Sequence, residues 1–132
     1  MHEVTGLKVL QVIEQAFRTT TEEQDDAILW LTRSMRAAGG DLMVLLRGHA
    51  VHYAVLTQRQ PALSLGDWHQ QQPAELHRDI SGLVESGVPV YAVQEDLDER
   101  GLAGLPLQAG VKSLGRDAVP GLYEQADQVW HW

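Results

Sequence analysis

Two short stretches carry the side chains best suited to chemistry, and each follows an apolar run typical of a buried strand. His49 and His52 lie in RGHAVH, at the end of the run DLMVLLR. Gln94, Glu95 and Asp96 follow VPVYAV with no glycine between. Imidazole titrates near neutral pH, so a histidine here could act as a general base or bind a metal. In an open parallel sheet, such side chains meet just beyond the carboxyl ends of the strands.

A third apolar run, LKVLQVI, ends in the same way with Glu14 and Gln15. We therefore expect a cleft or a partner contact at one sheet edge, with seven candidate residues: Glu14, Gln15, His49, His52, Gln94, Glu95 and Asp96. Each group also has an ordinary structural interpretation. The acids can cap a short helix, the histidines can be hydrogen-bonded loop residues, and Glu14 with Gln15 can begin a polar loop.

The spacing of His49 and His52 can place two imidazoles on one helical face, which zinc accepts. Two histidines without a third firm ligand are weak candidates, so we expect no metal site. Glycine-rich phosphate motifs are absent from the sequence as well. We therefore predict no cofactor.

The elements that would position these residues alternate between strand and helix. Strands are predicted over 7–13, 41–47 and 88–93, near Val111, and in the final QVWHW; helices over 21–38, from Pro73 to Val84, in the acidic stretch before Gly101, and near Tyr123. Residues 57–73 read as a loop, rich in Gln and Pro. This alternation predicts an α/β fold, a three-layer α/β/α arrangement with a mostly parallel sheet of about five strands.

Composition narrows the function. The chain of 132 residues is expected to form one domain, 1–132, and carries a net charge of −8 from 18 acidic and 10 basic residues. Such a charge argues against nucleic acids and anionic membranes as partners. The sequence shows no signal peptide and no membrane-spanning apolar run, so we expect a cytoplasmic protein. It contains no cysteine, which excludes disulfides, thiolate metal sites and a cysteine nucleophile.

Four tryptophans are a second notable feature, in a domain too small to bury them all easily. Trp30 lies off the apolar stripe of its helix, Trp68 lies in a polar loop, and Trp130 and Trp132 are in the final strand. Tryptophan is enriched at protein–protein interfaces. We interpret these four residues as candidates for an oligomer interface.

The strand VPVYAV with the following QEDLDERGL, the later LQAG and the final ADQVWHW together resemble the DsrE/DsrF/DsrH family, which includes the Tus sulfur-relay subunits. The segment VYAVQEDLDERGL is most similar to the DsrH/TusB type. The resemblance implies an α/β subunit that assembles into trimers or hexamers. It also implies a persulfide-carrying cysteine at the end of a strand. Counting back from Arg100 and Gly101, that position is Val93 here, and valine offers no nucleophile.

Two hypotheses follow. The first is a non-catalytic DsrE-like subunit that acts by self-association and by docking other sulfur-relay proteins. The second is a small-molecule- or metal-binding enzyme that uses His49, His52, Gln94 and Glu95. The missing thiol and the acidic surface favour the first, since an acidic surface suits a basic partner.

Overall fold

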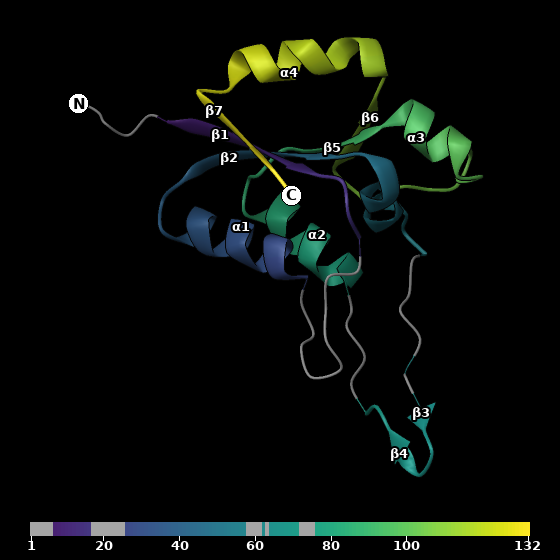
Figure 1. Ribbon diagram of the computed structural model, residues 1–132. Helices are drawn as coiled ribbons and strands as arrows, with labels where there is room; N and C mark the ends of the chain where they lie inside the picture. The colour runs from purple at the N-terminus through teal and green to yellow at the C-terminus, as the bar shows by residue number, and fades with distance from the viewer. Residues whose placement is uncertain (1–6, 17–25, 58–61, 63, 72–75) are drawn as a thin grey trace.

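The computed structural model describes residues 7–16, 26–57, 62, 64–71 and 76–132. Its centre is a five-stranded parallel sheet in the order β6-β5-β2-β1-β7 (Figure 1). The strands are β1 (Lys8–Ile13), β2 (Asp41–Leu46), β5 (Val90–Val93), β6 (Val111–Leu114) and β7 (Gln128–His131). Every neighbouring pair in this sheet is parallel. The predicted fold class is confirmed.

Helices cover both faces of the sheet, which gives the three layers (Figure 1). Helices α1 (Ala27–Ala37) and α2 (Leu76–Glu85) pack on one face, and α4 (Val119–Gln125) packs on the other. Three short helices lie beyond the carboxyl ends of the strands: η1 (Gly48–Ala54), α3 (Gln94–Glu99) and η2 (Arg116–Ala118). None of the helices in the described part of the chain is long and apolar enough to cross a membrane.

The alternation of side chains along the strands builds a separate core on each face. In β1, Val9 and Ile13 join the cluster beneath α1 and α2, whereas Leu10 and Val12 join the cluster beneath α4. Gln11 is fully buried on the α1 side, where its amide donates to Thr32 Oγ1 at 3.3 Å. The three inner strands, β1, β2 and β5, are mostly apolar on both faces because helices cover both faces of the sheet.

Asp26 sets the beginning of α1. One of its carboxylate oxygens accepts from the amides of Ile28 and Leu29 at 2.8 and 3.2 Å, which is a typical N-cap. The other accepts from the buried Tyr53 hydroxyl at 2.6 Å and ties the helix to η1. Residues 21–25 of the predicted helix lie outside the described residues.

The sequence prediction missed a small hairpin in the segment that it reads as a loop. Strands β3 (Ser64–Leu65) and β4 (Trp68–His69) pair antiparallel around Gly66 and Asp67. Gly66 has φ +59°, a left-handed conformation that suits a tight hairpin turn. Two-residue strands are too short for a pattern of alternating hydrophobicity, which is why the sequence reading did not detect them.

Candidate functional site

The residues that follow the five parallel strands share one edge of the sheet, where parallel topology predicts a site. Glu14 follows β1, Arg47 and Gly48 follow β2, Gln94 follows β5, and Trp132 follows β7. Two parts of this edge differ. Beyond the carboxyl ends of β5 and β6 the edge is occupied by ion pairs. Beyond the carboxyl ends of β1, β2 and β7 it forms an open hollow.

Asp96 is the centre of the occupied part, and its side chain is only 10% exposed. Its carboxylate accepts from the Gly48 amide at 2.8 Å and from the Arg116 guanidinium at 2.8 Å. The same guanidinium nitrogen lies 3.2 Å from Glu99, and the Arg116 backbone amide donates to Glu95 at 2.8 Å. Three acids of α3 therefore hold the segment that follows β6, and the network joins α3 to η1 as well.

The electrostatics keep Asp96 ionised. Burial by itself raises the pKa of this carboxyl, but the hydrogen bonds from Gly48 and Arg116 and the positive charges of Arg116 and Arg100 lower it by more. The resulting pKa lies below the ordinary value. An ionised carboxylate already engaged on both oxygens is suited to structure rather than to proton transfer.

Gly48 makes this contact possible through its backbone. Its φ of +58° is rarely adopted by other residues, and a Cβ there would lie 3.3 Å from the Glu14 carbonyl oxygen. The glycine lets the chain turn tightly after β2 while its amide points at Asp96.

The hollow lies beside this network and has a volume of about 480 Å³. Its lining residues lie just after β1, in η1, just after α3, and at the end of β7: Glu14, Gln15, Gly48, His49, Arg100, His131 and Trp132. His131 Nδ1 lies 3.8 Å from Glu14 Oε1, a distance that allows attraction but not a direct hydrogen bond. The hollow is thus lined by a carboxylate, a guanidinium and two imidazoles.

Three of the seven predicted cleft residues, Glu14, Gln15 and His49, line this hollow. The others lie elsewhere. His52 directs Nδ1 to the His49 carbonyl oxygen at 2.9 Å, and the Gln94 amide donates to Asp98 at 2.8 Å on the surface of α3. Glu95 and Asp96 belong to the Arg116 network. Among the residues that the structure describes, no three metal-ligating side chains group closely enough to hold an ion.

His131 and Arg100 line the hollow but were not among the predicted residues. A signal for His131 existed, because it lies near the carboxyl end of the predicted strand QVWHW. Its neighbour could not be known from the sequence, since β7 pairs with β1, the first strand of the chain.

Val93 is 1% exposed and packs in the cluster beneath α4. It also precedes the first residue of α3 as its N-cap position, with no side-chain hydrogen bond to offer. This side chain fills the core, and Val93 is not among the residues that line the hollow.

The four tryptophans divide into three exposed residues and one anchored residue. Trp30, Trp68 and Trp130 are 55%, 46% and 36% exposed. Trp132 is partly buried, and its indole N–H donates to Gln11 Oε1 at 2.9 Å. The exposed positions leave three large aromatic surfaces available to a partner.

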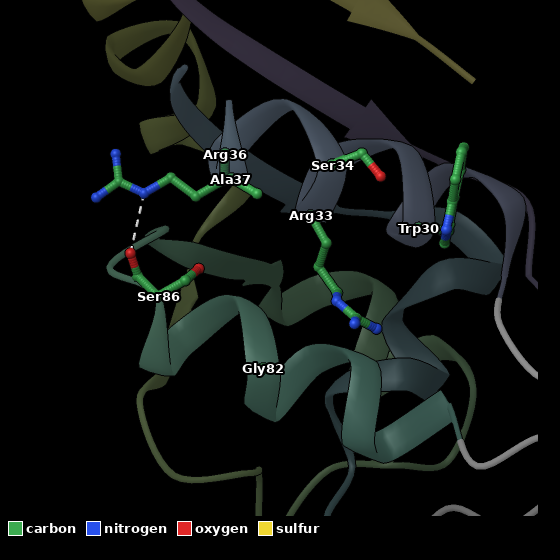
Figure 2. Close-up of a pocket in the computed structure, with 7 residues that line it drawn as sticks. All are labelled: Trp30, Arg33, Ser34, Arg36, Ala37, Gly82 and Ser86. Atoms are coloured by element: carbon green, nitrogen blue, oxygen red, sulfur yellow. Dashed lines mark hydrogen bonds between the residues drawn. The ribbon is translucent and has the colours of Figure 1, made fainter. Parts of the chain in front are cut away.

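A groove between α1 and α2 begins at Trp30 and has a volume of about 460 Å³ (Figure 2). Figure 2 shows Trp30 at one end of α1, Arg36 toward the other end, and Arg33 between them pointing to α2. The remaining lining residues are small: Ser34, Ala37, Gly82 and Ser86. The groove thus combines an aromatic ring, two arginines and a floor without bulky side chains.

Comparisons with known proteins bear on the fold alone. No protein-family model matches the sequence, and no curated protein matches it either. Two similar solved structures are the ychN protein from E. coli, with a TM-score of 0.75 and 21% identity, and a protein of unknown function, MTH1491 from Methanobacterium thermoautotrophicum, with a TM-score of 0.67 and 16% identity. Each match covers 96% of this chain and 100% of the other. The chain therefore has the same overall fold as these two proteins.

Proposed function

We propose that this protein is a non-catalytic, DsrE-like subunit that self-associates and docks other proteins of sulfur relay in the cytoplasm. The proposal rests first on the three exposed tryptophans, because large aromatic rings contribute most of the binding energy at many interfaces. Trimers or hexamers are the expected assemblies. The DsrH/TusB type is part of the proposal, supported by the segment VYAVQEDLDERGL, which forms β5, α3 and the turn at Gly101.

The chemistry of the strand edge supports a binding role. The chain has no cysteine, and the valine at the position where the resemblance implies a persulfide is buried. The acids nearest that position hold Arg116. A subunit with this edge would contribute surface and shape to an assembly rather than a sulfur-carrying group.

The geometry gives less support to an enzyme that uses His49, His52, Gln94 and Glu95. Only His49 of these four lines the hollow. Catalysis by several side chains requires them to reach one reacting group within hydrogen-bond distance. Their separate hydrogen bonds hold the other three in different places.

Tryptophan fluorescence tests this proposal. If the exposed indoles are covered by self-association, concentrated protein will emit at shorter wavelength and resist acrylamide quenching more than dilute protein. The Trp132→Phe variant should keep this change, because it lacks only the indole that is already partly buried. Emission and quenching that do not depend on protein concentration would contradict self-association through these residues.

A further inference from the structure

We propose that the β3–β4 hairpin of one chain docks in the α1/α2 groove of a second copy. The inference rests on the self-association proposed above and names its two surfaces. The hairpin surface is residues 64–69, and the groove surface is the set of residues drawn in Figure 2.

All six hairpin residues are exposed, and Figure 1 shows the hairpin well away from the sheet. Leu65 and Trp68 form one cross-strand pair beside the turn, and the Leu65 side chain is 61% exposed. Ser64 Oγ and His69 Nδ1 form the other cross-strand pair, 2.9 Å apart. An isolated two-stranded hairpin is only marginally stable in water. Burying the Leu65–Trp68 pair against another surface would supply the missing stabilisation.

The groove has the matching chemistry. Trp30 offers an exposed ring for apolar contact. The small side chains on the floor of the groove let a narrow hairpin approach the helix backbones. The Arg36 guanidinium donates to the carbonyl oxygens of Ser86 and Gly40 at 2.9 and 3.1 Å. Because carbonyl groups are neutral, these bonds orient the positive charge without neutralising it. Arg33 adds a second positive charge, partly compensated by its pair with Asp79 at 3.3 Å.

Charge selects the hairpin as the occupant. The chain carries a net charge of −8, so two copies repel each other except where local charges are complementary. Asp67 lies in the turn, next to Trp68, and presents a negative charge beside an apolar pair. An acidic tip with two apolar side chains fits a groove formed by a tryptophan and two arginines. The contact joins two different surfaces, so repeated docking generates closed rings or filaments.

A mixing experiment tests the inference, with each mass measured by light scattering. The hairpin variant is Leu65→Ser with Trp68→Ser, and the groove variant is Trp30→Glu. Both change exposed residues, and circular dichroism and the melting temperature check that each variant is folded.

Each variant alone should be monomeric, with self-association weakened about thirtyfold or more. A mixture of the two should form a one-to-one heterodimer, because the intact hairpin of the groove variant can dock in the intact groove of the hairpin variant. Leu105→Ser, which changes an exposed leucine outside both surfaces, is the control and should assemble normally.

A charge variant provides an independent test. Asp67→Arg removes one negative charge and adds one positive charge, so the net charge changes from −8 to −6. If only overall repulsion mattered, this variant would assemble more strongly than the wild type. Docking against Arg36 and Arg33 predicts weaker assembly instead.

The outcomes separate this inference from the proposed function. If the wild type assembles and the hairpin and groove variants assemble as well as the wild type does, the inference is wrong and self-association uses another surface. A mixture that stays monomeric, or a strengthened Asp67→Arg assembly, also overturns it. A wild type that is monomeric at every concentration overturns both proposals.

Discussion

At the scale of single residues, Asp96 carries the organisation of the sheet edge. It joins the turn after β2 to the segment after β6 through the Gly48 amide and the Arg116 guanidinium. Asp96→Asn should lower the free energy of unfolding by about 1–3 kcal/mol at neutral pH, since charge-assisted hydrogen bonds to a mostly buried carboxylate are lost. Chemical denaturation measures this change. Asp98→Asn is the matched control, and a change within about 0.5 kcal/mol is expected because Asp98 is exposed.

The same residue predicts a pH dependence. The pKa of Asp96 in the folded chain lies below its ordinary value of 3.8, so the unfolded chain binds this proton more readily. Its contribution to stability is therefore complete above that ordinary value and is lost as the pH falls through the lowered pKa. The stability gap between the wild type and Asp96→Asn should narrow in acid. A gap that stays constant from neutral pH into strong acid would contradict the assigned electrostatics.

Sequence reasoning reached part of this edge and missed the rest for a physical reason. The acids after VPVYAV were expected to begin a short helix, and Gln94–Glu99 is that helix. Their partner Arg116 comes 20 residues after Asp96 and is brought there by β6, whose parallel pairing with β5 no local pattern encodes. The hollow was predicted in part, through Glu14, Gln15 and His49, but His131 was missed because it comes to β1 only through the position of β7.

At the scale of elements, one buried side chain adds to the backbone pairing that holds the last strand in the sheet. Gln11 of β1 accepts from the Trp132 indole, and its amide donates to Thr32 of α1. Trp132→Phe removes the indole donor and leaves a buried oxygen of Gln11 without this partner, so a loss of about 1–3 kcal/mol in unfolding free energy is expected.

Trp130→Phe is the matched control for that substitution. Trp130 donates its indole N–H to Gln128 at 3.2 Å, but both residues are exposed and water can replace the bond. A change within about 0.5 kcal/mol is expected by thermal or chemical denaturation. Equal losses in the two variants would show that the Gln11 contact does not distinguish Trp132.

The elements that the sequence predicted well are those with a long or strongly apolar pattern. The runs LKVLQVI and DLMVLLR became β1 and β2, and QVWHW became β7. The hairpin is the opposite case. Its strands have two residues each and are exposed, so neither hydrophobic alternation nor burial marks them in the sequence.

At the scale of the whole molecule, charge and exposed aromatic surface act in opposite directions. A net charge of −8 keeps identical chains apart, whereas Trp30, Trp68 and Trp130 favour association wherever they can be buried. Two arginines line the α1/α2 groove together with Trp30: Arg33 in the middle and Arg36 toward the end opposite Trp30 (Figure 2). Association at this groove would bury aromatic surface and place an acidic segment against positive charge. Selective contact of this kind distinguishes a defined assembly from general aggregation.

Sedimentation velocity of the wild-type chain, over a dilution series from about 0.1 to about 100 μM, tests the central claim of self-association most directly. The chain has a mass of 14.7 kDa. The account predicts a discrete species of three or six chains that dissociates on dilution. A single species of one chain throughout the series would contradict it.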